Sequence, residues 1–290
     1  MSPSFETVRV AAVQATPVVL DAEASVEKAC RLLGEAADQG ARLAVLPEAF
    51  VPLYPSGAWA HDAGSFSGWG RLWQRLWENS IDVPGPLCER IAERCRELDL
   101  YCAIGVNERE AERPGSLYNT LLLLGPDGLL HKHRKLMPTM HERLFHGIGA
   151  GDDLAVTETQ IGRIGGLICW ENRMPLARYA LYRGGPQIWV APTADDSDGW
   201  LASMRHIAIE SGAYVVSVPQ YIPAAPAVIW RIFISSHKAQ VTKHNTQKNR
   251  TRRAKSQLVN HKSGIRVALF ERPASGTETP RCCLHGVAAS

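Results

Sequence analysis

Three residues with charged or nucleophilic side chains stand at the ends of apolar runs that are typical of buried strands. Glu48 comes directly after "RLAVLP", Lys135 comes at the end of an apolar hairpin, and Cys169 comes directly after "IGGLI". In layered α/β folds, strand ends open into loops that form ligand-binding crevices. Singly, each residue has a more ordinary interpretation as a solvated glutamate, a surface lysine or a thiol that fills the core. If all three face one pocket, that pocket contains a carboxylate, an ammonium group and a thiol nucleophile.

The elements that must position these residues alternate between strands and helices. The pattern predicts helices over 21–40, 85–100, 175–185 and 200–212, and strands over 7–17, 41–50, 101–110, 164–168, 187–194 and 214–220. A hairpin is predicted over 119–135, with Pro126, Asp127 and Gly128 at its turn. This alternation predicts an α/β fold in which helices cover the sheets, and the hairpin makes those sheets mixed.

Three motifs in this chain resemble those of a known family. "LPEAF" with Glu48, "HRKLMPT" with Lys135 and "CWEN" with Cys169 resemble, in this order, the catalytic blocks of the nitrilase superfamily of carbon–nitrogen hydrolases. The resemblance runs from about residue 8 to residue 220 and implies a four-layer α-β-β-α sandwich with mixed sheets. By the same resemblance, Glu142 in "MPTMHERL" is a second glutamate near the lysine.

Within the superfamily the chain is most similar to the nitrilase branch, as "FVPLYPSGAW" and "CWENRMPLARYALYRGG" illustrate. This similarity implies hydrolysis of a small organic nitrile to a carboxylic acid and ammonia, without a metal or organic cofactor. Trp170, Asn172 and Tyr54 are the predicted substrate-binding residues, and the first two favour a nitrile over an amide. An amidase or a cyanide-hydrolysing relative is the alternative within the family. Metal binding is not expected, because no Cys and His set has zinc-ligand spacing.

The residue types suit attack on a nitrile carbon, which is a poor electrophile. Cys169 is the predicted nucleophile, because a thiolate is soft and strong. Glu48 is the predicted general base and then acid, because burial can raise the pKa of a carboxyl group toward neutrality. Lys135 would stabilise the negative charge that develops on nitrogen and would also favour the thiolate. Glu142 is predicted to orient Lys135 and the attacking water.

Length and composition favour one large domain. The chain has 290 residues, of which 45% are hydrophobic, and seven cysteines, an odd number that does not suggest a disulfide framework. It contains no apolar run of 18 residues that could span a membrane, and its first residues lack the layout of a secretory signal. A cytoplasmic protein without a membrane partner is therefore expected.

The last part of the chain departs from the family pattern, so we expect a hydrolase domain over 1–222 and an atypical, poorly ordered basic tail over 223–290. Ten Lys and Arg residues and no acid lie between Arg231 and Arg266, among few apolar side chains. Such a composition buries too little surface to offset the entropy of ordering it. The family's closing strands are not recognisable there, which puts in doubt both the completed sheet and the homo-oligomer expected for the family.

Two explanations of this basic segment remain open. It could be a tail that binds nucleic acid or another anionic surface, although the aromatic residues typical of single-strand binding are missing, so nucleic acid is not the expected partner. A change of reading frame near residue 222 would also replace a native end with unrelated sequence. The alternative to an enzyme is a non-catalytic hydrolase fold that acts through this basic tail.

Overall fold

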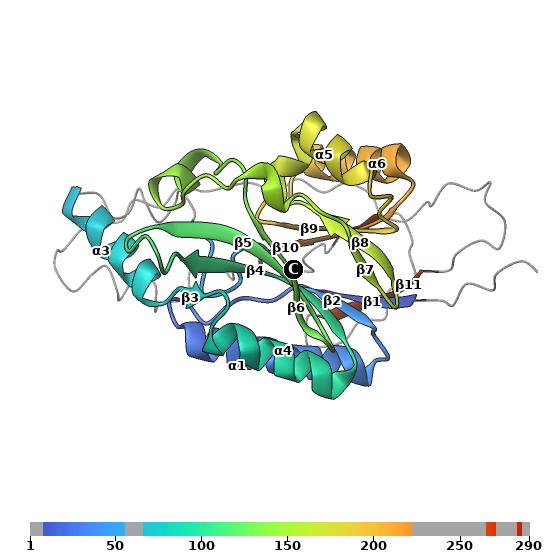
Figure 1. Ribbon diagram of the computed structural model, residues 1–290, viewed down its shortest axis with the longest axis horizontal. Helices are drawn as coiled ribbons and strands as arrows, with labels where there is room; N and C mark the ends of the chain where they lie inside the picture. The colour runs from blue at the N-terminus through green and yellow to red at the C-terminus, as the bar shows by residue number, and fades with distance from the viewer. Residues whose placement is uncertain (1–7, 56–65, 222–264, 271–282, 286–290) are drawn as a thin grey trace, which may run out of the picture.

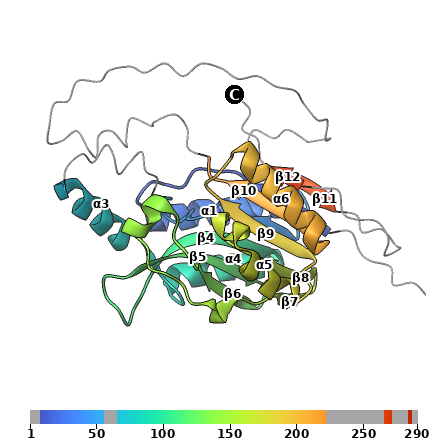
Figure 2. The same cartoon turned by 90° about the horizontal axis from the view of Figure 1, so that it is seen from above.

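Two β-sheets face each other in the computed structural model, which describes residues 8–55, 66–221, 265–270 and 283–285. Figure 1 shows helices α1 and α4 against the outer face of one sheet and helices α5 and α6 against the outer face of the other. In the view of Figure 2, α5 and α6 lie over β9 and β10. The four-layer α-β-β-α sandwich expected from the sequence is therefore confirmed.

The first sheet combines parallel and antiparallel strands. Its order is β11 (Ile265–Phe270), β1 (Val8–Val13), β2 (Leu43–Val45), β4 (Tyr101–Arg109), β5 (Leu117–Gly125) and β6 (Gly128–Arg134), with β3 (Ile81–Asp82) paired to the end of β4. Strands β1, β2 and β4 run parallel, whereas β4, β5 and β6 run antiparallel. The predicted hairpin is the β5–β6 pair, so this sheet is mixed as expected.

The second sheet is parallel except at one edge. Its order is β12 (Cys283–His285), β10 (Tyr214–Pro219), β9 (Ile188–Thr193), β8 (Gly162–Gly166) and β7 (Thr157–Thr159). Only β7 and β8 pair antiparallel among these strands. The end of β8 leads into the segment that contains Cys169.

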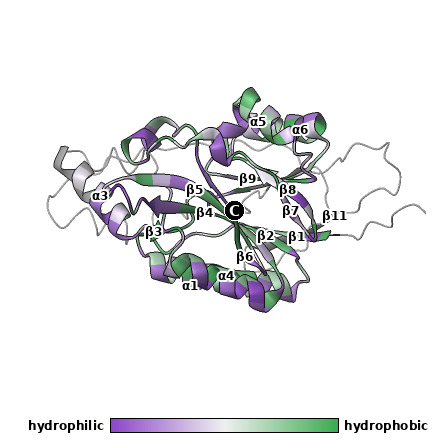
Figure 3. Ribbon diagram, in the orientation of Figure 1, coloured by the Kyte–Doolittle hydropathy of each residue, from purple (hydrophilic) through white to green (hydrophobic). Residues whose placement is uncertain are grey.

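Four of the five α-helices in the described residues lie where the sequence predicts helices, and the helix over 66–78 was not predicted. The α-helices of the described residues are α1 (Ala22–Asp38), α3 (Phe66–Glu78), α4 (Pro86–Leu98), α5 (Pro175–Tyr182) and α6 (Asp198–Ser211). Asp21 caps α1 by accepting a hydrogen bond from the backbone N–H of Ala24. Gly212 ends α6 with a φ of +67°, a conformation that costs glycine little. Figure 3 shows that polar and apolar residues share the helices, as amphipathic packing on a sheet requires.

The apolar residues form separate layers because strand side chains alternate between the two faces of a sheet. In β1, Ala11 and Val13 pack in the cluster that also contains α1 and α4 residues. Val10 and Ala12, on the opposite face, pack in a second cluster together with residues of β9 and β10. A third cluster lies between the second sheet and helices α5 and α6. The two sheets are thus held together by a continuous apolar layer.

Two strands lie in the segment where the sequence analysis expects none. β11 pairs antiparallel with β1, and β12 pairs parallel with β10. The run "IRVALF" at 265–270 has five apolar residues of six, but the basic segment that precedes it hides this pattern. The sequence analysis did not recognise a strand that closes the first sheet, but β11 lies at this edge of the sheet over 265–270. The rest of 223–290, apart from 283–285, lies outside the described residues.

Candidate active site

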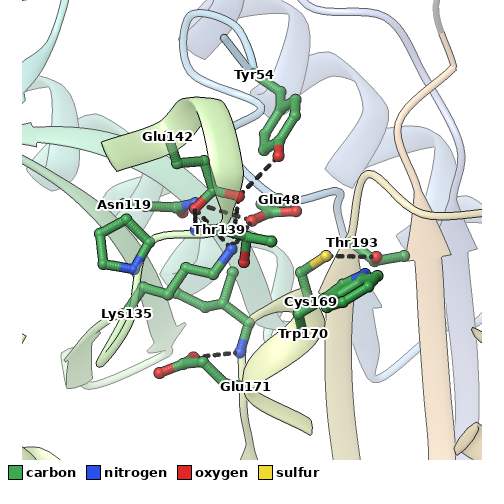
Figure 4. A network of polar contacts seen from close by, with 12 residues as sticks. Glu48, Tyr54, Asn119, Lys135, Thr139, Glu142, Cys169, Trp170, Glu171 and Thr193 are labelled. Carbon is green, nitrogen blue, oxygen red and sulfur yellow. Dashed lines mark hydrogen bonds and ion pairs between the residues drawn. The ribbon is translucent and has the colours of Figure 1, made fainter. Parts of the chain in front are cut away.

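The amine of Lys135 lies between two buried carboxylates (Figure 4). Its Nζ is 2.7 Å from Oε1 of Glu48 and 2.8 Å from both carboxylate oxygens of Glu142. All three side chains are almost completely removed from solvent. A buried charge is stable only when it is paired and hydrogen-bonded, so this arrangement fixes the position of each group.

The three groups titrate differently because their surroundings differ. Burial raises the pKa of Glu48 to about 7, and the negative charge of Glu142 adds to this effect, whereas Lys135 opposes it. Burial would lower the pKa of Lys135, but the two carboxylates outweigh it and raise that pKa above its usual value. For Glu142 the ammonium group outweighs burial, so its pKa falls below the usual value. At neutral pH Glu48 is therefore close to the midpoint of its titration, as a proton carrier requires.

Glu48 is held where a strand ends in a tight bend. Ala49 adopts a φ of +47°, and the preceding backbone passes very close to Gly105 of β4. A Cβ on Gly105 would lie 2.6 Å from the Cα of Glu48, so only glycine fits there. Asn119 of β5 donates a 2.8 Å hydrogen bond to Oε1 of Glu48. Oε2 is buried and has no hydrogen-bond partner within the described residues.

Cys169 comes from the other sheet and faces this cluster (Figure 4). It begins a 3-10 turn, η3 (Cys169–Arg173), with a φ of +47°, a conformation that costs a non-glycine residue about 1–3 kcal/mol. The hydroxyl of Thr193, at the end of β9, donates a 3.1 Å hydrogen bond to its sulfur. Burial and the nearby Glu48 raise the pKa of this thiol to about 12, although Lys135 and Thr193 oppose the shift. The resting group is therefore a thiol that needs a base.

The structure thus brings Glu48, Lys135, Glu142 and Cys169 together, as the sequence analysis predicts. Tyr54 joins them, because its hydroxyl donates a 2.7 Å hydrogen bond to Oε1 of Glu142. Burial and the neighbouring carboxylates raise the pKa of Tyr54 above its usual value, so this residue remains a donor.

The two other predicted substrate-binding residues are placed differently. Trp170 is 43% exposed, and its indole N–H donates to Oδ2 of Asp195. Asn172 is buried, and its amide nitrogen donates to the carbonyls of Leu167 and Cys169. Its Oδ1 accepts a 2.7 Å hydrogen bond from the indole of a buried tryptophan in β9. Asn172 therefore supports the Cys169 turn through contacts within the protein, which differs from the predicted contact with substrate.

Sequence reasoning missed Asn119, Thr193 and a further buried carboxylate, Glu171. Asn119 and Thr193 lie in β5 and β9, where a polar residue in an apolar strand is the only available signal. Glu171 is part of the "CWEN" motif, and its two oxygens accept hydrogen bonds from the backbone N–H groups of Leu136 and Ile168. Its position immediately after the nucleophile segment was a signal that could have singled it out.

No group of three or more His, Cys, Asp or Glu side chains in the described part of the chain is arranged to hold a metal ion. Across the same residues, none of the helices combines the length and apolarity needed to cross a bilayer.

Comparison with known sequences identifies the family. The sequence model described as carbon-nitrogen hydrolase matches residues 9–244. The chain belongs to the carbon-nitrogen hydrolase family. The resemblance to the nitrilase superfamily is thereby confirmed, and the matched region extends beyond residue 222, where we expected the hydrolase domain to end.

Several relatives of this carbon-nitrogen hydrolase are named nitrilases. It is 48% identical over 216 residues to the aliphatic nitrilase of Sinorhizobium fredii (strain HH103). This match covers 74% of this chain and 69% of the relative. It is 45% identical over 226 residues to a bifunctional nitrilase/nitrile hydratase of Lupinus angustifolius, covering 76% of this chain and 64% of the relative. The chain therefore spans less than two thirds of the length of the lupin relative.

Solved structures share the fold of this carbon-nitrogen hydrolase at lower identity. Nit3 of Saccharomyces cerevisiae, a member of branch 10 of the nitrilase superfamily, superimposes with a TM-score of 0.61 at 21% identity, covering 74% of this chain and 76% of its own. XC1258 of Xanthomonas campestris, a CN-hydrolase superfamily protein, superimposes with a TM-score of 0.60 at 21% identity. The match covers 75% of this chain and 77% of XC1258. At this identity the likeness supports the fold alone.

Proposed function

We propose that this chain is a nitrilase that hydrolyses a small organic nitrile to a carboxylic acid and ammonia. The observation that supports it most directly is the set of buried groups around Lys135, with the Cys169 thiol facing the carboxylate–ammonium cluster (Figure 4). The similarity to proteins named nitrilases supports the choice of substrate. No cofactor is needed, because the side chains supply the nucleophile, the base and the charge stabilisation.

In the first half-reaction, the carboxylate of Glu48 takes the proton from Sγ of Cys169. Its buried Oε2, which has no partner within the described residues, is the oxygen free to accept this proton. The sulfur forms a bond to the nitrile carbon, and an electron pair of the carbon–nitrogen triple bond moves to nitrogen. Glu48 then returns the proton to that nitrogen. The product is a neutral thioimidate attached to Cys169.

In the second half-reaction, Glu48 acts again as a base. It takes a proton from water, whose oxygen adds to the thioimidate carbon, and the nitrogen receives the proton. Glu48 then passes the proton of the new hydroxyl group to this nitrogen, and the carbon–nitrogen bond breaks as the carbonyl forms, so that ammonia leaves and a thioester remains. A second water molecule then breaks the carbon–sulfur bond, which releases the carboxylic acid and returns a proton to the thiol of Cys169.

Lys135 and Glu142 have supporting roles in this proposal. The ammonium group of Lys135 stabilises negative charge on the substrate nitrogen and later on oxygen. Its pKa is raised by the neighbouring carboxylates, so it stays charged throughout the working pH range. Glu142 contacts Nζ with both oxygens and is itself held by Tyr54, so it orients the lysine. Trp170, which is partly exposed next to the nucleophile, remains a proposed substrate contact.

The decisive experiment is a search for a covalent adduct on Cys169. The protein is incubated with a panel of nitriles, and ammonia release and the mass of the Cys169 peptide are measured. We expect ammonia, the acid, and a trapped thioimidate or thioester on this peptide. A Cys169→Ala variant should release no ammonia, and Cys88→Ala, which removes another buried thiol, serves as a control that keeps activity. Substantial ammonia release by Cys169→Ala would contradict the assignment.

The same assay separates the alternatives. An amidase would release ammonia from the amide and not from the nitrile, and a cyanide-hydrolysing relative would act on cyanide. A non-catalytic protein would show no adduct on Cys169 and would retain nucleic acid in a salt-sensitive manner. The cytoplasmic location, the homo-oligomer and the division into 1–222 and 223–290 stay predictions, to be tested by fractionation, sedimentation and limited proteolysis of the full chain.

A further inference from the structure

A hydrogen-bonded chain of three charged side chains, two of them buried, lies beside the reactive groups. His133, near the end of β6, places its Nδ1 2.7 Å from Oδ1 of Asp153 in the 3-10 turn η2 (Gly151–Asp153). Its Nε2 is 3.2 Å from both carboxylate oxygens of Glu171. His133 and Glu171 are almost completely buried. None of these three residues has a part in the proposed reaction.

The geometry determines the charge of His133. An ionised carboxylate can only accept hydrogen bonds, so both ring nitrogens must donate to satisfy Asp153 and Glu171. A neutral imidazole has one donor and would direct the lone pair of its other nitrogen at a carboxylate. His133 is therefore an imidazolium cation between two acids.

The two acids also hold the backbone that carries the catalytic groups. Glu171 accepts hydrogen bonds from the N–H of Leu136, directly after Lys135, and at 2.8 Å from the N–H of Ile168, directly before Cys169. Asp153 accepts a 2.8 Å hydrogen bond from the N–H of Arg134, directly before Lys135. One carboxylate thus joins the lysine segment of the first sheet to the cysteine segment of the second.

We propose that Glu171, held by the His133 imidazolium, is a positioning residue that fixes the distance between Lys135 and Cys169, and that loss of the His133 proton sets the alkaline limit of the enzyme. This inference deepens the proposed nitrilase function and rests on it. Without its proton, His133 leaves Glu171 and Asp153 without the cation between them. The negative charges of the two carboxylates are then no longer balanced, and the hydrogen-bonded link between the Lys135 segment and the Cys169 segment weakens.

The position of this alkaline limit follows from the groups that face His133. They are Asp153 on η2, Glu171 on η3 and the neighbouring His131 on β6. Burial opposes the charged ring, but the hydrogen bonds to Asp153 and Glu171 outweigh it and raise the pKa of His133 to about 9. Because the pKa of Cys169 is about 12 and that of Lys135 is also raised, an activity loss near pH 9 belongs to neither of them. The activity present at neutral pH should be retained up to about pH 9 and lost as the pH rises through this value.

The experiment compares kcat and KM from pH 6 to 10 for wild type, Glu171→Gln and His133→Gln, with Glu158→Gln on the exposed face of β7 as a matched control. In Glu171→Gln an NH2 group replaces one carboxylate oxygen, so a donor would face the N–H groups that Glu171 accepts hydrogen bonds from. We expect the kcat of this variant to fall at least tenfold with KM changed less than threefold. His133→Gln has no proton to lose at this position, so its kcat should be low throughout the range and its alkaline limb near pH 9 should disappear. Wild-type values of kcat in Glu171→Gln, or an unchanged alkaline limb in His133→Gln, would overturn the proposal.

A second measurement does not depend on activity or on the variants folding. In the wild-type protein labelled with 15N-histidine, one of the ten histidines should keep both ring nitrogens protonated until about pH 9. If every histidine titrates below pH 8, the charged link does not exist and the inference fails. If the wild type hydrolyses no nitrile while this signal is present, the proposed function fails and the buried imidazolium stands.

Discussion

Replacing Glu142 with glutamine would test the charge arrangement around Lys135 without changing the size of the side chain. In the wild-type protein, Glu142 and Glu48 share the same ammonium group, and the negative charge of Glu142 raises the pKa of Glu48. Removing that charge favours the ionised form of Glu48. The pKa of Glu48 must therefore fall, and with it the acid limb of the pH profile of kcat/KM.

The magnitude follows from the geometry. The distances from Nζ of Lys135 to Oε1 of Glu48 and to Glu142 are 2.7 and 2.8 Å, so the nearest oxygens of the two acids lie no more than 2.7 + 2.8 = 5.5 Å apart. At this separation and an effective dielectric constant of about 20, two unit charges repel by about 3 kcal/mol. Since one pKa unit corresponds to about 1.4 kcal/mol, the acid limb should move down by roughly two pH units, from about 7 to about 5.

The assay is ammonia release from an active nitrile at low substrate concentration between pH 4 and 9. The control is Asp82→Asn, which removes a carboxylate that pairs with Arg109 at the end of β4 and contacts none of the catalytic groups. Its acid limb should coincide with that of the wild type. An acid limb in Glu142→Gln that stays at about pH 7 or moves upward would refute the idea that the carboxylate of Glu142 raises the pKa of Glu48.

Two further substitutions test how Glu48 is held. Gly105→Ala should lower the free energy of unfolding by about 1–3 kcal/mol and reduce activity, because the added Cβ would overlap the Glu48 backbone. The control is Gly70→Ala on α3, where the added Cβ would meet nothing within 4 Å. In thermal unfolding this control should be at least as stable as the wild type. Equal stability of both variants would contradict this reasoning. Asn119→Leu removes the hydrogen bond to Oε1 of Glu48, so the acid limb of kcat/KM should move up by about one pH unit, and a downward shift would be inconsistent with that bond favouring the carboxylate.

The sequence predicted the layers and the reactive groups from different kinds of signal. Glu48 and Cys169 follow apolar runs at strand ends, so the periodicity that predicts the sheets also indicates where their side chains emerge. Lys135 follows a hairpin with a strong turn signal. Their convergence could be expected only through the family resemblance, because sequence spacing alone does not place two sheets face to face.

Other features of the site depend on contacts that span the chain. Asn119 approaches Glu48 from a position 71 residues away, just before a run of leucines that indicates only a buried strand. Asn172 was predicted to contact substrate because it belongs to the same "CWEN" motif as Cys169, but its side chain folds back onto the Cys169 turn. Strand β11 was missed because its six residues come at the end of a basic segment, and pairing with β1 is a long-range interaction that composition does not report.

The proposed base and the proposed nucleophile follow strands of two separate sheets, and this has a consequence for variants far from the reaction. Glu48 follows a strand of the first sheet, and Cys169 follows a strand of the second. The apolar side chains between the sheets, Val45 and Val216 among them, determine the distance between the two sheets. A methyl group added or removed in this layer would alter the reach of the sulfur toward its proton acceptor. Across a series of such interior substitutions, kcat and the compressibility of the protein should therefore vary together. Substitutions in the apolar layer between the sheets could thus change turnover without altering any reacting group.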